Sequence, residues 1–201
     1  MRSLRFTKII LTLRICTLMR TMRLSNFVRE YDNVIPLSFC DELTHLFDVS
    51  RYQQVIDNDY KPFFTEVNLT RHYPHLFNKM VDITLPVIEK YRSDFDKETK
   101  FWQKDIALEE FRIKRYNANT GEQFADHVDA ASLESAKRYL AFLFYLNDNF
   151  VGGETLFLPD KQVEPKKGSV VVFPPTWQYP HAGSPLMKGT KYIMSTYLNF
   201  T

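Results

Sequence analysis

The chain has 201 residues, of which 44% are hydrophobic and 15% aromatic, enough for a single domain with a sizeable core. Its formal net charge is only +2, and the chain after residue 25 is mildly acidic, which argues against nucleic acid as the main partner, because phosphate binding needs clustered cations. The cysteines, Cys16 and Cys40, exclude a disulfide framework and predict a cytoplasmic location, where thiols stay reduced.

The start of the chain differs from the rest in charge. Residues 1–25 hold six basic side chains and no acidic one, which leaves 20 basic and 24 acidic residues, a net charge of −4, for the remainder. This basic extension fits a targeting peptide, a membrane-surface helix or a disordered segment. The apolar run at residues 9–13 is broken by Arg14 and is too short to cross a bilayer, so no transmembrane segment is predicted.

Residues 36–104 are predicted to form a supporting layer of helices. A first helix carries Leu43, Leu46 and Phe47 on one face. Residues 53–61 are polar and predict a loop. A longer helix is expected over about residues 74–91 with Pro86 as a kink. Its apolar residues at helical spacing are Leu76, Met80, Ile83, Leu85 and Ile88.

After Trp102 the pattern changes from helical to extended spacing. Residues 111–116 alternate, and residues 139–146 are a continuous apolar run typical of a strand covered on both faces. Further short strands are expected at 154–158, 169–173 and 191–198, separated by glycine and proline turns. This pattern predicts a jelly roll (double-stranded β-helix) over residues 105–200. The expected fold class is mainly β with supporting helices (α+β).

His127 and Asp129 are candidate metal ligands. In an extended segment, residues two apart point to the same side, so one strand end can present both side chains to one ion. His181, on a distant strand, would add a second imidazole. Two histidines and one carboxylate suit iron(II) and leave the opposite coordination positions open. On its own, a His-x-Asp pair also fits a solvated turn.

Lys191 stands at the start of the apolar strand expected over residues 191–198. An unpaired charge inside a protein is costly. The lysine is therefore expected either to bind an anion in a pocket or to point to solvent from an edge strand.

Several motifs follow one another in an order known from one enzyme family. They are Tyr116, His127-x-Asp129, Tyr145-Leu146-Asn147, Gly152-Gly153-Glu154-Thr155, Pro165-Lys166-Lys167-Gly168, His181-Ala182-Gly183 and Lys191. In this order they resemble the 2-oxoglutarate- and iron(II)-dependent oxygenases, and most of all the prolyl 4-hydroxylase-like branch. The resemblance covers about residues 105–200 and implies an oxygenase domain over residues 26–201.

The resemblance implies a dioxygenase that hydroxylates a C–H bond. Its catalytic Fe(2+) would be held by His127, Asp129 and His181, with 2-oxoglutarate and O2 as cosubstrates and with ascorbate as a further candidate cofactor. The resemblance assigns Lys191 to the distal carboxylate of 2-oxoglutarate. It assigns hydroxyl hydrogen bonds with the same cosubstrate to Tyr116 and Thr155. Two further positions, Arg138 and Tyr197, match places that face the substrate, although related enzymes often carry tryptophan at the second.

A prolyl residue in a peptide or protein is the leading substrate by this resemblance. Two other functions stay open. One is a 2-oxoglutarate oxygenase that acts on a free amino acid or another small molecule. The other is a cupin-like protein that binds metal without redox chemistry. Lys191 argues against the second, because such a protein has no need of a cation in its pocket.

Overall fold

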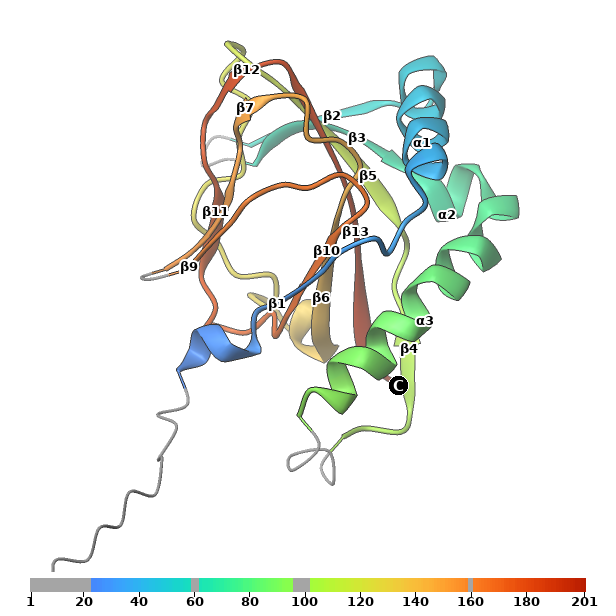
Figure 1. Cartoon of the computed structure of the whole chain (residues 1–201), viewed down its shortest axis with the longest axis vertical. Coiled ribbons are helices and arrows are strands. Elements are labelled where there is room, and N and C mark those ends of the chain that lie inside the picture. Colours follow the sequence, from blue (N-terminus) through green and yellow to red (C-terminus); the bar gives the residue numbers. More distant parts are fainter. Residues whose placement is uncertain (1–22, 59–61, 96–101, 159–160) are drawn as a thin grey trace, which may run out of the picture.

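The computed structural model describes residues 23–58, 62–95, 102–158 and 161–201 (Figure 1). Its helices are η1 (Leu24–Phe27), α1 (Leu37–Val49), α2 (Leu69–His72), η2 (Pro74–Leu76), α3 (Phe77–Ser93) and η4 (Ser135–Lys137). Its strands are β1 (Arg29–Tyr31), β2 (Gln54–Asp57), β3 (Phe63–Asn68), β4 (Ile106–Leu108), β5 (Arg112–Asn117), β6 (Arg138–Tyr145), β7 (Val151–Gly152), β8 (Thr155–Phe157), β9 (Lys161–Val163), β10 (Val170–Phe173), β11 (His181–Gly183), β12 (Leu186–Lys188) and β13 (Thr190–Phe200).

The strands form facing antiparallel layers, which is the jelly roll predicted from the sequence. Within the described residues, an eight-stranded sheet has the order β1-β10-β6-β13-β5-β3-β2, with β4 also paired to β13. The strands of a three-stranded sheet (β11-β8-β9) and a two-stranded sheet (β12-β7) form the other layer (Figure 1). β13 pairs with β4, β5 and β6, so it runs through the middle of the large sheet.

Strand alternation divides the large sheet into a face that packs on helices and a face that lines the interior. On β13, Met194 and Leu198 belong to the core beneath the helices. The alternate residues Ile193 and Tyr197 belong to a second cluster inside the roll. Lys191 has the same parity as this second pair, so the strand directs it to the interior.

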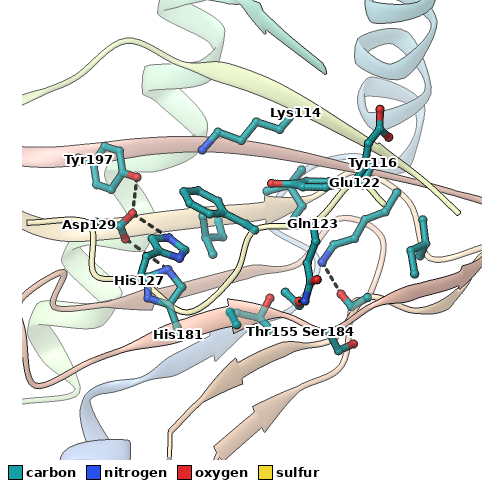
Figure 2. Close-up of a pocket in the computed structure, with 18 residues that line it drawn as sticks. Lys114, Tyr116, Glu122, Gln123, His127, Asp129, Thr155, His181, Ser184 and Tyr197 are labelled. Atoms are coloured by element: carbon teal, nitrogen blue, oxygen red, sulfur yellow. Dashed lines mark hydrogen bonds and ion pairs between the residues drawn. The ribbon is translucent and has the colours of Figure 1, made fainter. Parts of the chain in front are cut away.

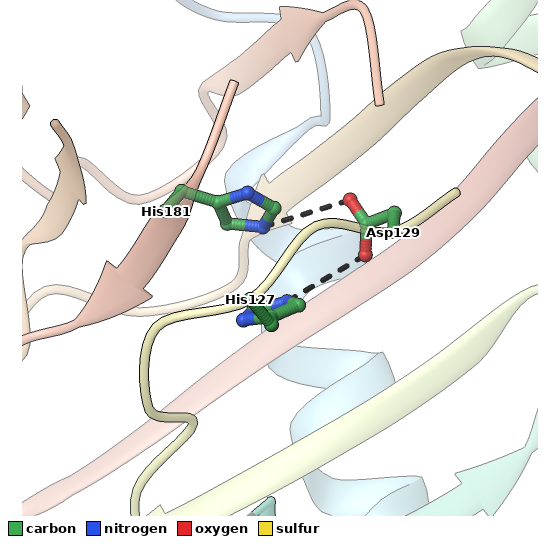
Figure 3. Close-up of side chains that lie close together, drawn as sticks. All are labelled: His127, Asp129 and His181. Atoms are coloured by element: carbon green, nitrogen blue, oxygen red, sulfur yellow. Dashed lines mark ion pairs between the residues drawn. The ribbon is translucent and has the colours of Figure 1, made fainter. Parts of the chain in front are cut away.

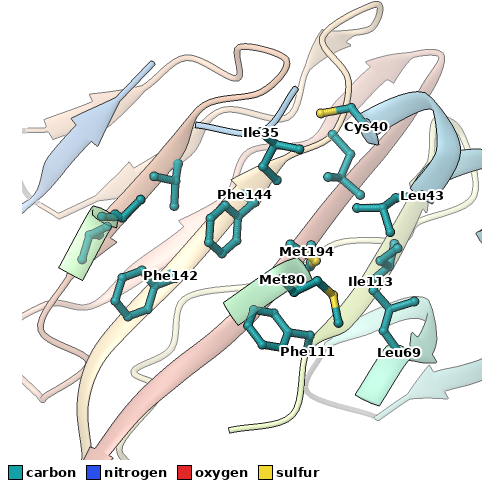
Figure 4. Packing of buried hydrophobic residues seen from close by; sticks show 14 of the residues in the cluster. Ile35, Cys40, Leu43, Leu69, Met80, Phe111, Ile113, Phe142, Phe144 and Met194 are labelled. Atoms are coloured by element: carbon teal, nitrogen blue, oxygen red, sulfur yellow. The ribbon is translucent and has the colours of Figure 1, made fainter. Parts of the chain in front are cut away.

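The hydrophobic core beneath the helices packs on the outer face of the large sheet (Figure 4). Leu43 and Phe47 of α1, Met80 of α3, and Phe142 and Phe144 of β6 have no exposed surface. Truncating a buried phenylalanine to alanine costs about 3–5 kcal/mol. This layer therefore supplies much of the stability and leaves the inner face of the sheet free to line a cavity.

The predicted loop over residues 53–61 is wrong at its start, where β2 forms. β2 is largely exposed and lacks an alternating apolar pattern. It exists because its backbone pairs with β3, with Gln54 opposite Glu66, and such non-local pairing leaves no local signal. Residues 36–104 therefore supply strands of the large sheet as well as helices.

The two predicted helices are confirmed, with a change of face in the second. α3 contains Pro86 as expected, but Leu85 is 50% exposed. The buried side chains include Met80, Thr84 and Val87, which follow the i, i+4, i+7 spacing of one helix face. A residue five positions after Met80 falls outside that face.

The basic extension predicted over residues 1–25 lies outside the described residues as far as residue 22. Its three interpretations therefore stay predictions. In the described parts of the chain, no helix is both long enough and apolar enough to span a membrane. Cys40 is a buried free thiol in α1.

Candidate active site

His127 and His181 are joined by a single antiparallel bridge. The His127 amide donates to the His181 carbonyl oxygen at 3.0 Å, and the His181 amide donates in return at 2.9 Å. Residues that exchange two hydrogen bonds in this way lie directly opposite each other, with their side chains on the same side. His181 begins β11, but His127 lies in an irregular segment. Where the sequence predicts a strand end at His127 and Asp129, the structure therefore has a single β-bridge at His127.

The candidate ligands converge on one point (Figure 3). Their ligand atoms all lie within 4.8 Å of one another. Asp129 Oδ1 is 3.6 Å from His127 Nε2, and Asp129 Oδ2 is 3.5 Å from His181 Nε2. Each imidazole Nδ1 lies against a backbone carbonyl oxygen, that of Ala125 at 2.8 Å and that of Tyr179 at 3.1 Å. An Nδ1 that donates to a carbonyl leaves Nε2 free to bind a metal ion.

The Asp129 carboxyl group is oriented by its neighbours. The Tyr197 hydroxyl donates to Oδ1 at 2.8 Å. Burial acts to raise the pKa of Asp129, but the neighbouring imidazoles of His127 and His181 and the hydrogen bond from Tyr197 hold this pKa well below its ordinary value. Among the described residues, Asp129 Oδ2 is buried and has no hydrogen-bond partner. A buried oxygen left in this state suits a group that binds a cation.

The donor set fits iron(II). Burial lowers the pKa of His181, against the opposing charge of Asp129, and a neutral imidazole is the form that binds metal. Two imidazoles and one carboxylate that approach from one side leave the other side of an ion open to small ligands.

A cavity lies beside these ligands (Figure 2). Apolar side chains line part of it, among them Leu143, Leu186 and Ile193. The predicted cosubstrate residues Lys191, Tyr116 and Thr155 line the same cavity.

Lys191 is buried in the wall of this cavity and only 4% exposed. Its Nζ donates to the Gly153 carbonyl oxygen and lies 5.6 Å from the centre of the Tyr145 ring. Burial lowers the pKa of Lys191 from 10.5 to about 7, although Glu154 acts in the opposite direction. A charged ammonium here would gain strongly from an anion in the cavity.

Because the pKa of Lys191 is lowered by burial, we expect the stability of the protein without 2-oxoglutarate to depend on pH. Between about pH 7 and 10.5 the unfolded chain keeps a proton that the folded protein has lost, so the free energy of unfolding rises with pH in this window. Below this window the cost of burying the charge is fully present. We expect Lys191→Met to abolish the rise, measured by urea unfolding of both proteins across the window. Equal slopes would show that Lys191 is not the group responsible.

Tyr116 and Thr155 lie close to Lys191 in different ways. Tyr116 on β5 is the register partner of Lys191 on β13. The Thr155 hydroxyl shares a hydrogen bond of 2.6 Å with the Tyr145 hydroxyl. The hydrogen bonds of Tyr116 and Thr155 to 2-oxoglutarate stay predictions.

Arg138 and Tyr197 surround the backbone and carboxylate of Asp129. Arg138 donates to the Asp129 carbonyl oxygen at 2.8 Å and to both oxygens of Glu109 at 3.0 Å. Its guanidinium carbon lies 3.7 Å from the centre of the Tyr197 ring. Tyr197 lines the main cavity, whereas Arg138 lies in an adjoining groove. Both side chains hold Asp129 in place, and their contact with a substrate stays a prediction.

Tyr197→Phe is expected to weaken metal binding by about 10- to 100-fold, because it removes the hydroxyl that orients Asp129. The ring that packs on Arg138 remains, so the fold should be unchanged. Titration with Mn(II), followed by electron paramagnetic resonance, measures the affinity. Tyr192→Phe is the matched control, since Tyr192 lies on the same strand but donates to Asp48 at the surface. Equal affinities of the two variants would contradict this role.

Among the cavity side chains that sequence reasoning missed are Lys114 and Phe124. The Phe124 ring stacks on the His127 imidazole with 3.6 Å between ring centres. Lys114 stands two residues before Tyr116 on β5, so alternation places both on one face. That parity is visible in the sequence, but the contact of Phe124 with His127 is visible only in the fold.

Comparison with known proteins agrees with this geometry. The model of the 2OG-Fe(II) oxygenase superfamily matches residues 111–199, whereas no curated protein matches the sequence. A viral collagen prolyl hydroxylase from Paramecium Bursaria Chlorella virus-1, solved with 2-oxoglutarate, is 19% identical with a TM-score of 0.63, over 87% of this chain and 97% of that chain. A prolyl 4-hydroxylase from Pseudomonas putida is 16% identical with a TM-score of 0.65, over 87% and 93%. A prolyl hydroxylase from Trichoplax adhaerens is 14% identical with a TM-score of 0.67, over 87% and 84%.

The matched segment contains the whole candidate site. His127, Asp129, His181 and Lys191 all fall within residues 111–199, and the solved structures share the fold that carries them. The segment from residue 111 to residue 199 therefore belongs to the 2OG-Fe(II) oxygenase superfamily, on a fold like that of the prolyl hydroxylases.

Proposed function

We propose that this chain is an Fe(II)- and 2-oxoglutarate-dependent dioxygenase that hydroxylates a C–H bond of a prolyl residue in a peptide or protein. The observation that carries the proposal is the convergence of His127, Asp129 and His181 at a cavity that also contains the buried Lys191. A metal-binding set and a buried cation in one cavity suit a cosubstrate that binds the metal at one end and carries a carboxylate at the other.

Iron, when bound, supplies the oxidation of 2-oxoglutarate by O2 to succinate and CO2, coupled to the insertion of one oxygen atom into a C–H bond. The protein holds and orients the reactants. His127 and His181 present Nε2, and Asp129 presents its carboxylate, held by the Tyr197 hydroxyl. Lys191 is suited to bind the distal carboxylate of 2-oxoglutarate by a charge-assisted contact.

The apolar side chains of the cavity wall also exclude water. Leu143 and Ile193 line it beside the ligands, and the Phe124 ring covers one face of the His127 imidazole. An apolar wall strengthens the attraction between Lys191 and an anion, because charges interact more strongly where water is excluded.

A peptide substrate is favoured by the structural neighbours and by the open groove beside the cavity. The Trichoplax adhaerens enzyme was solved with a peptide fragment of the hypoxia-inducible factor oxygen degradation domain. In the present chain, a groove shared by Asp129, Tyr197 and Arg138 adjoins the cavity, and such a groove can hold an extended segment. The match to the oxygenase superfamily makes the cupin-like alternative without redox chemistry the weaker one. The cytoplasmic location stays a prediction.

The test is turnover. The purified protein is incubated with Fe(II), 2-oxoglutarate and ascorbate, with and without proline-containing peptides, and succinate and peptide masses are measured. The proposal expects iron-dependent succinate formation and a peptide that gains one oxygen atom. A reaction without ascorbate tests separately whether the enzyme uses it.

Two results would change the proposal. No iron-dependent succinate under any of these conditions would contradict the oxygenase function itself. Succinate with an oxygenated free amino acid, and with no oxygenated peptide, would favour the small-molecule alternative.

A further inference from the structure

Lys114 is a cation beside the candidate metal site, and no described residue forms an ion pair with it. It lies on β5 and is partly buried. Within the described parts of the chain, its Nζ makes no hydrogen bond or ion pair. Figure 2 shows its amine directed toward the side of the cavity where Tyr197 and Asp129 lie.

The acidic side chains around Lys114 already have other partners. Glu66, its register partner on β3, accepts from Arg112 at 2.9 Å. Glu110 accepts from Asn68 at 2.7 Å and also from Arg112. Glu109 is bound by Arg138 through two hydrogen bonds of 3.0 Å. The remaining acid, Asp129, belongs to the metal-binding set. Among the described residues, no acidic side chain is therefore left to pair with Lys114 alone, although Glu66 and Asp129 attract its charge from a distance.

Two aromatic rings position this charge. Lys114 Nζ lies 5.2 Å from the centre of the Phe64 ring and 5.4 Å from that of Phe124. Phe124 itself stacks on His127, with 3.6 Å between ring centres, so one ring separates the ammonium from a metal ligand. Contacts of this kind favour a cation at a given place without neutralising its charge.

Lys114 stands where the cavity meets the groove. It lines both spaces, as do Phe124, Asp129 and Tyr197. Lys191, in contrast, lines only the cavity and donates to Gly153. A molecule that enters along the groove and reaches the metal-binding set passes Lys114, whereas the cosubstrate proposed for Lys191 lies deeper. Burial lowers the pKa of Lys114, which an anion alongside would reverse.

We propose that Lys114 binds a carboxylate of the substrate, next to the carbon that is hydroxylated. The inference rests on the proposed function and adds a substrate class to it. The carboxylate is either an acidic side chain beside the target residue of a peptide or the α-carboxylate of a free amino acid. Both place an anion within a few bonds of the reacting carbon, as the position of Lys114 requires.

The test compares matched pairs of substrates in wild-type protein and in Lys114→Met. One pair is a set of proline-centred peptides with aspartate or glutamate beside the proline and the same set with asparagine or glutamine. The other pair is L-proline and L-prolinamide. We expect the wild-type kcat/KM to be about 10- to 100-fold higher for the carboxylate member of one pair, as expected for one charge-assisted contact. The pair that shows the preference identifies the source of the carboxylate.

The Lys114→Met variant should lose this preference through a higher KM for the substrate, with little change in kcat or in the KM for 2-oxoglutarate. Lys114→Arg should retain the preference, because it keeps the charge. Lys104→Met is the matched control, since Lys104 is exposed. A purely structural role of Lys114 would affect both members of a pair equally.

Several results would overturn the inference. The first is that the wild type shows no preference for the carboxylate member of either pair, and the second is that Lys114→Met keeps the wild-type preference. The same holds if Lys114→Met changes the KM for 2-oxoglutarate and not the KM for the substrate, or if the wild type oxidises none of the probes that carry a carboxylate. Succinate formed from 2-oxoglutarate without any substrate monitors the proposed function separately. If that background reaction is present and the preference is not, the inference about Lys114 fails and the oxygenase function stands.

Discussion

Replacing Asp129 with alanine is expected to lower iron-dependent succinate formation by roughly a thousandfold or more, because the metal would lose its anionic ligand. Asp129 is the carboxylate of the converging set, with the ligand atoms within 4.8 Å of one another. His127 and His181 alone offer neither the negative charge nor the third bond on that face. The variant should still fold, since Asp129 lies outside the hydrophobic core beneath the helices. Leaving the buried Tyr197 hydroxyl unpaired costs about 1–3 kcal/mol.

Metal-dependent stability distinguishes the loss of metal from the loss of fold. Ligands that bind only the folded state raise its stability, so Mn(II) should raise the thermal midpoint of the wild type and leave that of Asp129→Ala unchanged. Circular dichroism checks that the variant is folded. Asp126→Ala is the matched control, because Asp126 is exposed in the same segment and should keep both activity and the response to Mn(II). Normal succinate formation by Asp129→Ala would refute the assigned ligand set.

Lys191→Met is expected to raise the KM for 2-oxoglutarate by roughly 30-fold or more, since losing one partner of a buried charge pair costs about 2–5 kcal/mol. Methionine keeps much of the length of the side chain, so the shape of the cavity should change little. The variant should be at least as stable as the wild type near pH 7, because Lys191 is only 4% exposed and burying its charge is unfavourable without an anion.

The control for the Lys191→Met variant is a substitution of a lysine that does not line the cavity. Lys188→Met serves this purpose, because Lys188 is exposed on the neighbouring β12. Initial rates of succinate formation at increasing 2-oxoglutarate concentration give the KM of each protein. A KM for Lys191→Met that equals the value for Lys188→Met would remove Lys191 from the cosubstrate site.

The candidate metal ligands could be named from the sequence because they stand in short patterns. His127 and Asp129 are two residues apart, and the order of the motifs around them picked out His181 and Lys191. What joins His127 to His181 could not be predicted in the same way. The expected strand is a single bridge, which two distant backbones form without any residue preference in either segment.

The contacts of Arg138 and Tyr197 depend on which polar groups the fold brings within reach of them. From the sequence, both match positions that face a substrate. In the fold, Glu109 binds the guanidinium of Arg138, and the Tyr197 hydroxyl donates to Asp129. No sequence pattern reveals which of several possible partners a long polar side chain will reach, because the partners come from β6, β13 and the segments between strands.

The sequence by itself predicted the jelly roll, the outer helices and the candidate metal ligands, because alternation, helical spacing and motif order are local or sequential properties. The tertiary structure alone decided that β2 completes the edge of the sheet, that Tyr197 holds Asp129, and that Lys114 forms no ion pair with any residue the structure describes. The physical reason is that hydrogen bonds and ion pairs act over a few ångströms between residues that only folding brings together.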